Sequence, residues 1–475
     1  MRRWALLLLA FVLLAAGGGL LAWNHWGKEP GNVSNPDVEF DADEDAPKAK
    51  PKPERFVWPF YGFTPDRTRY LETDLDPPFD KVWRTRLGHL IEFQPILVNG
   101  MLYVVPNDGL AYGIDAKTGK VRWRTRVGTL NASSPAYADG RLFIATLSGR
   151  ITALEAKSGR QTWKRNLPSR SESSPVVVDG KVFFGSENGT VYALKAQTGR
   201  QLWRYRAGGA VKAGLAYKGG RLFFGDYAGK VTAIRASNGS KVWDTGTKGR
   251  SFGRSGNFYS TPAVKYGRVY IGNTDGFVYS FAASSGKLAW RHSTGSYVYA
   301  APAVARVPGT PPSVYIGSYD GHFYALDARS GNVRWRYDAG GRISGAPSVI
   351  GKVVYFSELA NKTTSGVDVR TGHRVFKLSS GAFNPAISDG KRLYVTGYSS
   401  LFAFEPHRRQ KATPAKPRKR HHRAKPHRKR PKHHAKKRRH RKAKHHAKKR
   451  HHRAKKRHHR ATRHRPSTEG LQKSG

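Results

Sequence analysis

Short apolar runs broken by glycine-containing pairs dominate the chain from about residue 56 to residue 406. The unit is clearest in Gly180 to Trp203, where two β-branched or aromatic runs are separated by Asn-Gly and Thr-Gly pairs. Such pairs supply the positive φ angles of tight hairpins, and runs of this length are typical of strands. A small-residue run before each unit, such as Ser173 to Val178, adds a fourth strand. The pattern predicts an all-β domain built from four-stranded units.

The units recur at a nearly fixed period. A large aromatic residue ends each one, at intervals of 40 residues and then of 47, 45 and 41, at Trp83, Trp123, Trp163, Trp203, Trp243, Trp290, Trp335 and Phe376. Repeats of this length indicate a solenoid or a propeller, and four strands per repeat favour a β-propeller. A large aromatic at one point of every blade suits the packing of neighbouring blades better than a ladder for stacking ligands.

The ends of the repeat region give the number of blades. Eight units begin, near Gln94, Ser134, Ser174, Ala213, Thr261, Ala301, Ala346 and Asn384. The eighth ends at Leu401 to Pro406 without its aromatic strand, and an unused strand of that kind, Asp80 to Arg86, precedes the first unit. We expect this strand to pair with the last blade, which closes the ring without open sheet edges. The sequence therefore predicts an eight-bladed propeller over residues 54–406.

The repeat resembles a known family. The pattern Asp-Gly-x-Val/Phe-Tyr-Ala-Leu-Asp-Ala-x-Ser/Thr-Gly-x-x-x-Trp, nearly complete in Asp320 to Trp335 and in Gly109 to Trp123, looks like the pyrroloquinoline-quinone-like (PQQ-like) propeller repeat. The resemblance covers about residues 80–406. The same repeat is known from quinoprotein alcohol and glucose dehydrogenases, from the outer-membrane β-barrel assembly lipoprotein and from extracytoplasmic scaffold or sensor propellers. It therefore implies the fold and leaves the function open.

The residues that carry the dehydrogenase chemistry do not carry over. Those enzymes stack their quinone on an adjacent Cys pair and hold calcium with Glu, Asn and Asp side chains. This chain contains no Cys, and no acidic residues map onto that calcium site. The lipidated Cys of the assembly lipoprotein is missing as well. We expect a non-enzymatic scaffold or binding module that has no cofactor or metal and binds protein partners on one face of the propeller. The alternative is a PQQ-dependent dehydrogenase.

The N-terminus has the pattern of a membrane anchor. After Met1 to Arg3, an uncharged run of 20 residues from Trp4 to Trp23 has the length of a transmembrane helix. Basic residues before it and acidic residues after it predict a cytoplasmic stub at 1–3, a signal anchor at 4–23 and an extracytoplasmic propeller. A cleaved signal peptide, which would yield a secreted protein, is the alternative. Residues 24–53 have no apolar periodicity and are predicted to form a disordered linker.

Charge is concentrated at the other end. The net charge is +53, and residues 407–465 contain 30 Lys or Arg, 14 His and no acid. We predict that residues 407–475, the cationic tail, are disordered and bind a polyanion without sequence preference: an anionic envelope polymer, an acidic lipid or nucleic acid. Nucleic-acid binding inside the cell, which requires the opposite topology, and a merely solubilising tail are the alternatives.

Two loops are longer than their counterparts in other repeats, at Thr245 to Phe258 and at Arg306 to Ser313. Insertions into repeats often lie on one binding face. Lys248, Arg250 and Arg254 make the first of them a candidate anion-binding loop.

Overall fold

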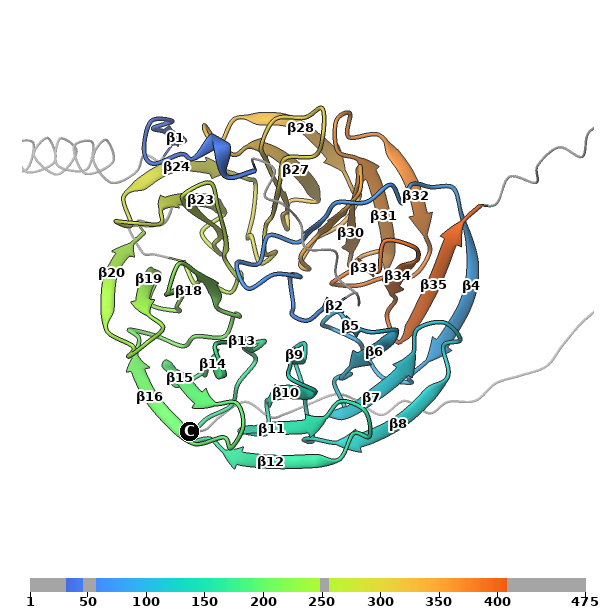
Figure 1. Ribbon diagram of the computed structural model, residues 1–475. Coiled ribbons are helices and arrows are strands. Elements are labelled where there is room, and N and C mark those ends of the chain that lie inside the picture. Colours follow the sequence, from blue (N-terminus) through green and yellow to red (C-terminus); the bar gives the residue numbers. More distant parts are fainter. Residues whose placement is uncertain (1–30, 46–56, 248–255, 408–475) are drawn as a thin grey trace, which may run out of the picture. The chain divides into compact units, whose positions relative to one another are not determined.

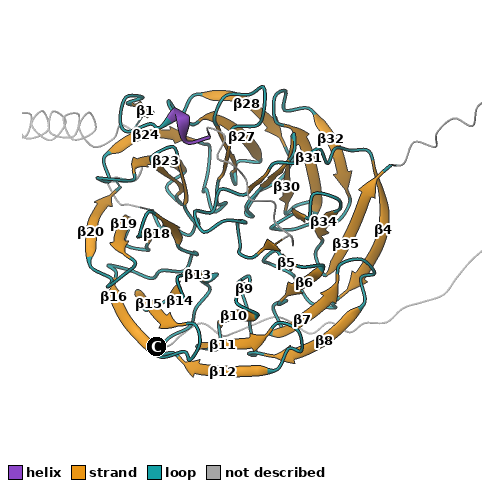
Figure 2. Cartoon of the chain, in the orientation of Figure 1, coloured by secondary structure: helices purple, strands orange, loops and turns teal. Residues whose placement is uncertain are grey.

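Eight blades arranged in a ring form the body of the protein (Figure 1). The computed structural model describes residues 31–45, 57–247 and 256–407. In these ranges the chain forms 35 strands and a single 3₁₀ turn, Ala42–Asp45, and Figure 2 shows strands and connecting loops throughout the ring. The predicted all-β, eight-bladed propeller is confirmed. Within the described ranges no helix is long and apolar enough to cross a membrane; the predicted anchor at 4–23 and the cationic tail lie outside them.

Each blade is an antiparallel sheet of four strands, numbered here from the central channel outward. Blade 1 consists of β5 (Ile96–Val98), β6 (Met101–Val104), β7 (Leu110–Asp115) and β8 (Val121–Arg126), and blade 2 of β9 (Ala136–Ala138), β10 (Arg141–Thr146), β11 (Arg150–Glu155) and β12 (Gln161–Asn166). Blade 3 consists of β13 (Val176–Val178), β14 (Lys181–Gly185), β15 (Thr190–Lys195) and β16 (Gln201–Arg206), and blade 4 of β17 (Ala216–Lys218), β18 (Arg221–Gly225), β19 (Lys230–Arg235) and β20 (Lys241–Gly246). Blade 5 consists of β21 (Ala263–Lys265), β22 (Arg268–Gly272), β23 (Phe277–Ala282) and β24 (Leu288–Ser293), and blade 6 of β25 (Ala303–Ala305), β26 (Ser313–Gly317), β27 (His322–Asp327) and β28 (Val333–Asp338). Blade 7 consists of β29 (Ser348–Ile350), β30 (Val353–Glu358), β31 (Thr363–Asp368) and β32 (Arg374–Leu378), and blade 8 of β33 (Ala386–Ser388), β34 (Leu393–Thr396), β35 (Ser400–Pro406) and β4 (Phe79–Arg86).

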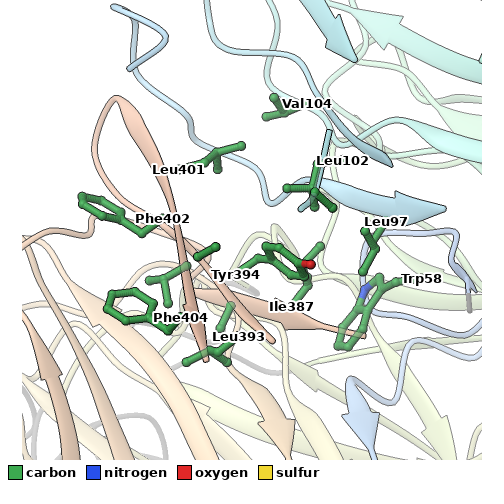
Figure 3. Packing of buried hydrophobic residues seen from close by; sticks show 14 of the residues in the cluster. Trp58, Leu97, Leu102, Val104, Ile387, Leu393, Tyr394, Leu401, Phe402 and Phe404 are labelled. Carbon is green, nitrogen blue, oxygen red and sulfur yellow. The ribbon is translucent and has the colours of Figure 1, made fainter. Parts of the chain in front are cut away.

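The ring closes in blade 8, as predicted. β4, from the N-terminal side of the repeats, pairs antiparallel with β35 from the end of the ring, with Ser400 opposite Arg86 and Pro406 opposite Phe79. Figure 3 shows the apolar side chains that pack around this seam. Because β4 and β35 lie at opposite ends of the repeat region, only non-covalent contacts join them.

The aromatic residue that ends each repeat lies on the outermost strand of its blade and contacts the next blade. In seven blades the indole N–H donates to a backbone carbonyl of the following blade at 2.9–3.2 Å. The pairs are Trp83–Ala116, Trp123–Ala156, Trp163–Ala196, Trp203–Ala236, Trp243–Ala283, Trp290–Ala328 and Trp335–Val369. Phe376 has no N–H to donate, and its ring packs instead against Phe79, Tyr355 and Phe404 at the seam.

The predicted disordered linker at 24–53 is wrong for residues 31–45. β1 (Val33–Ser34) pairs with β24 as a fifth strand on the outer edge of blade 5, and the apolar Val38 and Phe40 then pack against the core between blades 5 and 6. The acidic residues that suggested a solvated spacer form ion pairs. Glu44 pairs with Lys218, and Asp45 with Lys265 at 2.8 Å. Basic residues of the ring neutralise the acidic side chains of this segment and hold it in place. These partners lie far away in the sequence, so the composition of the segment does not reveal them.

Candidate binding site at the mouth of the central channel

The two faces of the ring carry different connections. Strand direction alternates within a blade, so the turns between the first and second and between the third and fourth strands share one face, the turn face. The opposite face, the loop face, carries the second-to-third turns and the loops from each blade to the next. The described ends of the first insertion, 245–247 and 256–258, therefore lie on the loop face, whereas 306–313, between β25 and β26, lies on the turn face. The described parts of the two insertions do not share one face.

The central channel is filled by the chain itself. Residues 57–71, the plug, include β2 (Val57–Trp58), which pairs with β5 of blade 1, and β3 (Tyr70–Leu71), which runs parallel to β29 of blade 7. Between them, backbone carbonyls of the plug accept hydrogen bonds from the innermost strands of blades 2, 4, 5, 6 and 7 at 2.8–2.9 Å. Figure 1 shows this blue segment crossing the middle of the ring. The inner strand edges, which would otherwise face an open channel, are thereby covered.

A fully buried arginine of the plug binds the segments that lead into blades 3 and 4. Arg67 has no exposed surface and a φ of 63°. Its guanidinium group donates to the carbonyl oxygens of Leu215 at 2.8 Å, Ser174 at 3.0 Å and Pro175 at 3.1 Å, and also to that of Tyr61. Burial lowers the pKa of this guanidinium group, since no water solvates the charge. Four carbonyl acceptors on three elements compensate part of that cost and hold Tyr61 in place.

Above the plug, at the loop face, lies a small cavity of about 40 Å³. Its floor is Tyr61, whose hydroxyl donates to the Oδ1 atom of Asn384 at 3.0 Å. Phe93, Tyr259 and Tyr299 contribute aromatic residues to its wall. The volume holds roughly three water molecules, since one water needs about 10–15 Å³. The cavity therefore suits a single small polar group.

Two carboxylates and one amine face this cavity. The Lys212 ammonium group is bound to Glu172 at 2.7 Å and to Glu187 at 3.2 Å, and the hydroxyl of Tyr259 donates to Glu172 at 2.6 Å. Glu92 accepts a 3.3 Å hydrogen bond from the amide of Asn107. Among the described residues, no cation lies within ion-pair distance of Glu92. Burial, together with the negative charge of Glu172, raises the pKa of Glu92.

A group of tyrosines extends from the cavity over blades 4 to 6 on the loop face. The tyrosine arc consists of Tyr227, Tyr259, Tyr297, Tyr299 and Tyr319. Successive ring centroids lie 6.5 Å (Tyr227–Tyr259), 5.8 Å (Tyr259–Tyr299) and 4.8 Å (Tyr299–Tyr319) apart, and Tyr297 is 51% exposed. Partly exposed tyrosines of this kind are enriched at protein interfaces.

The cavity residues come from one position of the repeat. Six of them lie in the loop that leads into the inner strand of a blade: Glu92, Glu172, Lys212, Tyr259, Tyr299 and Ser344. Five of these lie two residues before the start of their repeat, and Lys212 lies one residue before it. The period that locates the tryptophans also locates these residues. These residues belong to no ligand motif or catalytic motif, so their sequence signal is only their recurrence at one point of the repeat.

The sequence-predicted site residues are placed differently. The eight repeat-ending aromatics lie on outer strands, away from the cavity. The candidate anion-binding residues Lys248, Arg250 and Arg254 fall in 248–255, outside the described residues. Within the described ranges, no cluster of three His, Cys, Asp or Glu side chains that could hold a metal ion is found.

The closed ring of eight four-stranded repeats defines a propeller of the quinoprotein type. The family described as outer membrane protein assembly factor BamB matches residues 80–135, 123–298 and 275–407, and the chain belongs to this family. No curated protein matches the chain.

Solved structures with the same fold include both non-enzymes and enzymes. BamB from Moraxella catarrhalis is 18% identical, with a TM-score of 0.57 over 69% of this chain and 100% of that one. A europium-containing methanol dehydrogenase is 16% identical, with a TM-score of 0.62 over 74% and 98%. The quinohemoprotein alcohol dehydrogenase from Comamonas testosteroni is 15% identical, with a TM-score of 0.63 over 79% and 84%. At such identities the likeness concerns the fold alone.

The channel mouth does not fit the quinone cofactor of those dehydrogenases. Pockets for ligands of that size measure roughly 300–1,000 Å³, whereas this cavity measures about 40 Å³ above the plug. The cofactor is a tricarboxylate, and Glu92 and Glu172 would repel it. Glu172 is already bound to Lys212 and Tyr259, so it is poorly placed to bind calcium.

Proposed function

We propose that this protein is a non-enzymatic scaffold of the cell envelope, whose loop face binds a protein partner. The observation that carries the proposal is the filled channel. In the described part of the chain, the plug contacts inner strands around the ring, and a small polar mouth lies above it beside partly exposed tyrosines. A rigid floor with an aromatic rim is suited to docking a side chain of a partner, because little reorganisation is needed on binding. Membership of a family named for an assembly factor supports the same role.

The proposal includes the location of the two ends of the chain. Residues 4–23 anchor the protein with the N-terminus in the cytoplasm and the propeller outside, or act as a signal whose cleavage releases it. The cationic tail then meets anionic polymers or lipids of the envelope, to which it binds by charge neutralisation. A topology reporter fused after Gly475 is expected to be active only outside the cytoplasm; activity inside would contradict this arrangement.

The test of the non-enzymatic role is reconstitution. The purified full-length protein is incubated with pyrroloquinoline quinone and calcium, and oxidation of alcohols and sugars is followed with an artificial electron acceptor. A quinoprotein dehydrogenase of known activity is the positive control. We expect no turnover and no change in the melting temperature. Oxidation that depends on the quinone would overturn the proposal.

A further inference from the structure

Among the residues that the structure describes, the charges at the channel mouth leave one carboxylate, that of Glu92, without a counterion. Lys212 is shared by Glu172 and Glu187, and Arg170 lies 3.9 Å from Glu187. Within the part of the chain that the structure describes, the side chain of Glu92 has no ion-pair partner, and its carboxylate accepts a hydrogen bond from the neutral amide of Asn107. A carboxylate buried beside a second carboxylate is unfavourable unless a cation compensates it. Such an arrangement is expected where a positively charged group binds, because a binding site is optimised for its complex instead of for the empty protein.

The aromatic wall has the geometry that stabilises a cation. Tyr259 and Tyr299 present rings to the same cavity as Glu92, and their centroids are 5.8 Å apart. A cation within about 6 Å of a ring face is attracted by the electron density of that face. The arc already binds cations at its periphery, where Lys212 lies 5.5 Å from the Tyr227 centroid and Arg342 lies 5.7 Å from that of Tyr319.

The size of the cavity selects the kind of cation. A cavity of about 40 Å³ has the size for the tip of a Lys or Arg side chain. The tyrosine arc outside the cavity offers area for the residues that flank such a tip, and Tyr is a residue type enriched in interface hot spots. A partner that combines a cationic tip with flanking apolar residues therefore complements both parts of the surface.

We propose that the channel mouth binds a single Lys or Arg side chain of a partner protein, with its charged tip between Glu92 and the rings of Tyr259 and Tyr299. This inference rests on the proposed scaffold function and names the chemistry of the partner. The flanking residues of the partner segment pack on the tyrosine arc. Because the net charge of the chain is strongly positive, the unpaired carboxylate of Glu92 gives the mouth a local negative charge that favours a cationic side chain there.

The test uses a pair of matched peptides and the full-length protein at physiological salt. The probe is a labelled, terminally blocked peptide with one arginine among apolar residues. Its control carries citrulline, which has nearly the same shape without the charge. We expect the arginine peptide to bind at least tenfold more tightly, because a hydrogen bond to a charged group is stronger than one between neutral groups. Equal affinity of the two peptides overturns the proposal.

Two substitutions locate the binding. Glu92→Gln is expected to reduce affinity for the arginine peptide to that of the citrulline peptide. The same change on the turn face, Glu155→Gln, should have no effect. Glu92→Gln is also expected to leave the melting temperature unchanged or raised at pH 7, because it removes a half-buried charge. Tyr299→Leu, which removes a ring, should weaken binding several-fold. Unchanged affinity in Glu92→Gln overturns the proposal, and Tyr299→Leu provides the test if that variant does not fold.

The outcomes separate this inference from the scaffold function. Calcium chloride alone is titrated as a rival cation, and tight calcium binding that depends on Glu92 and excludes the peptide would replace the proposed side chain with a metal. Oxidation in the quinone reconstitution contradicts the scaffold function, whatever the peptides do. An inert reconstitution combined with no preference for arginine contradicts only the inference about the partner.

Discussion

Replacing Trp83 with alanine should weaken the ring at its seam. Trp83 lies on β4, and it contacts both blade 8 and blade 1. Its indole N–H donates to the Ala116 carbonyl at 3.1 Å, and its ring centroid lies 6.1 Å from that of Tyr394. Gly119 of blade 1 lies so close to the ring that an added Cβ would be 2.7 Å from it. The substitution therefore removes contacts on both sides of the junction.

The magnitude follows from these contacts. Truncating a fully buried large aromatic side chain to alanine costs roughly 3–5 kcal/mol. Trp83 is only partly buried, and its hydrogen bond contributes about 1 kcal/mol. We therefore expect the free energy of unfolding to fall by about 2–3 kcal/mol. Trp203→Ala is the matched control. Trp203 makes the equivalent hydrogen bond to Ala236 at 3.2 Å, but at the junction of blades 3 and 4, away from the seam.

The assay combines denaturant unfolding with native-state hydrogen exchange. Both variants should lose similar global stability. Only Trp83→Ala should selectively accelerate exchange in β35 and β4, because a short hairpin tethers the control's outer strand to its own blade whereas no chain connection of that kind joins β4 to β35. The reasoning is refuted if exchange in β35 rises equally in both variants, or in neither.

Three further expectations test the turns, the ion pairs and the tail. Gly159 and Gly140 have φ angles of 73° and 77°, but an added Cβ at Gly159 would lie 2.4 Å from an indole ring whereas Gly140 faces open space; in denaturant titrations Gly140→Ala should cost about 1–2 kcal/mol and Gly159→Ala about 1–3 kcal/mol more. Hydrogen bonding to Arg122 lowers the pKa of Asp115 to about 2, so its contribution, about 0.5–1 kcal/mol after solvent screening, should be present above pH 4 and disappear as the pH falls to about 2; Asp115→Asn should lose this step in acid titrations of stability, and a retained step would assign it to other carboxylates. The full-length protein should bind polyphosphate with an affinity that falls steeply with salt and rises between pH 7.5 and 5.5 as tail histidines gain charge, and equal binding by a chain ending at His407 would exclude the tail.

The sequence was sufficient for the ring because its determinants repeat. A tryptophan at a fixed interval and turn glycines such as Gly159 recur in almost every blade, so the period, the blade number and the closing strand Asp80 to Arg86 could be derived without coordinates. The plug could not. Arg67 is charged, and its burial depends on carbonyl groups that belong to other blades and are more than 100 residues away. Only the aromatic-rich run Phe56 to Phe63 hinted that this segment is buried.

The same repeat that builds the ring also explains how it acquires a site. At the outer strand every blade needs the same contact with its neighbour, so the aromatic marker hardly varies along the chain. At the loop before the inner strand the blades do not share one common contact, so the residue type varies, and six of the eight equivalents line the cavity at the channel mouth. There the chain carries Glu92, Glu172, Lys212, Tyr259 and Tyr299. Because the plug closes the channel beneath them, these side chains face one small space, where their differences can act together on a single ligand group. A position that varies among otherwise similar repeats and points to their common axis is therefore where recognition is expected in this propeller.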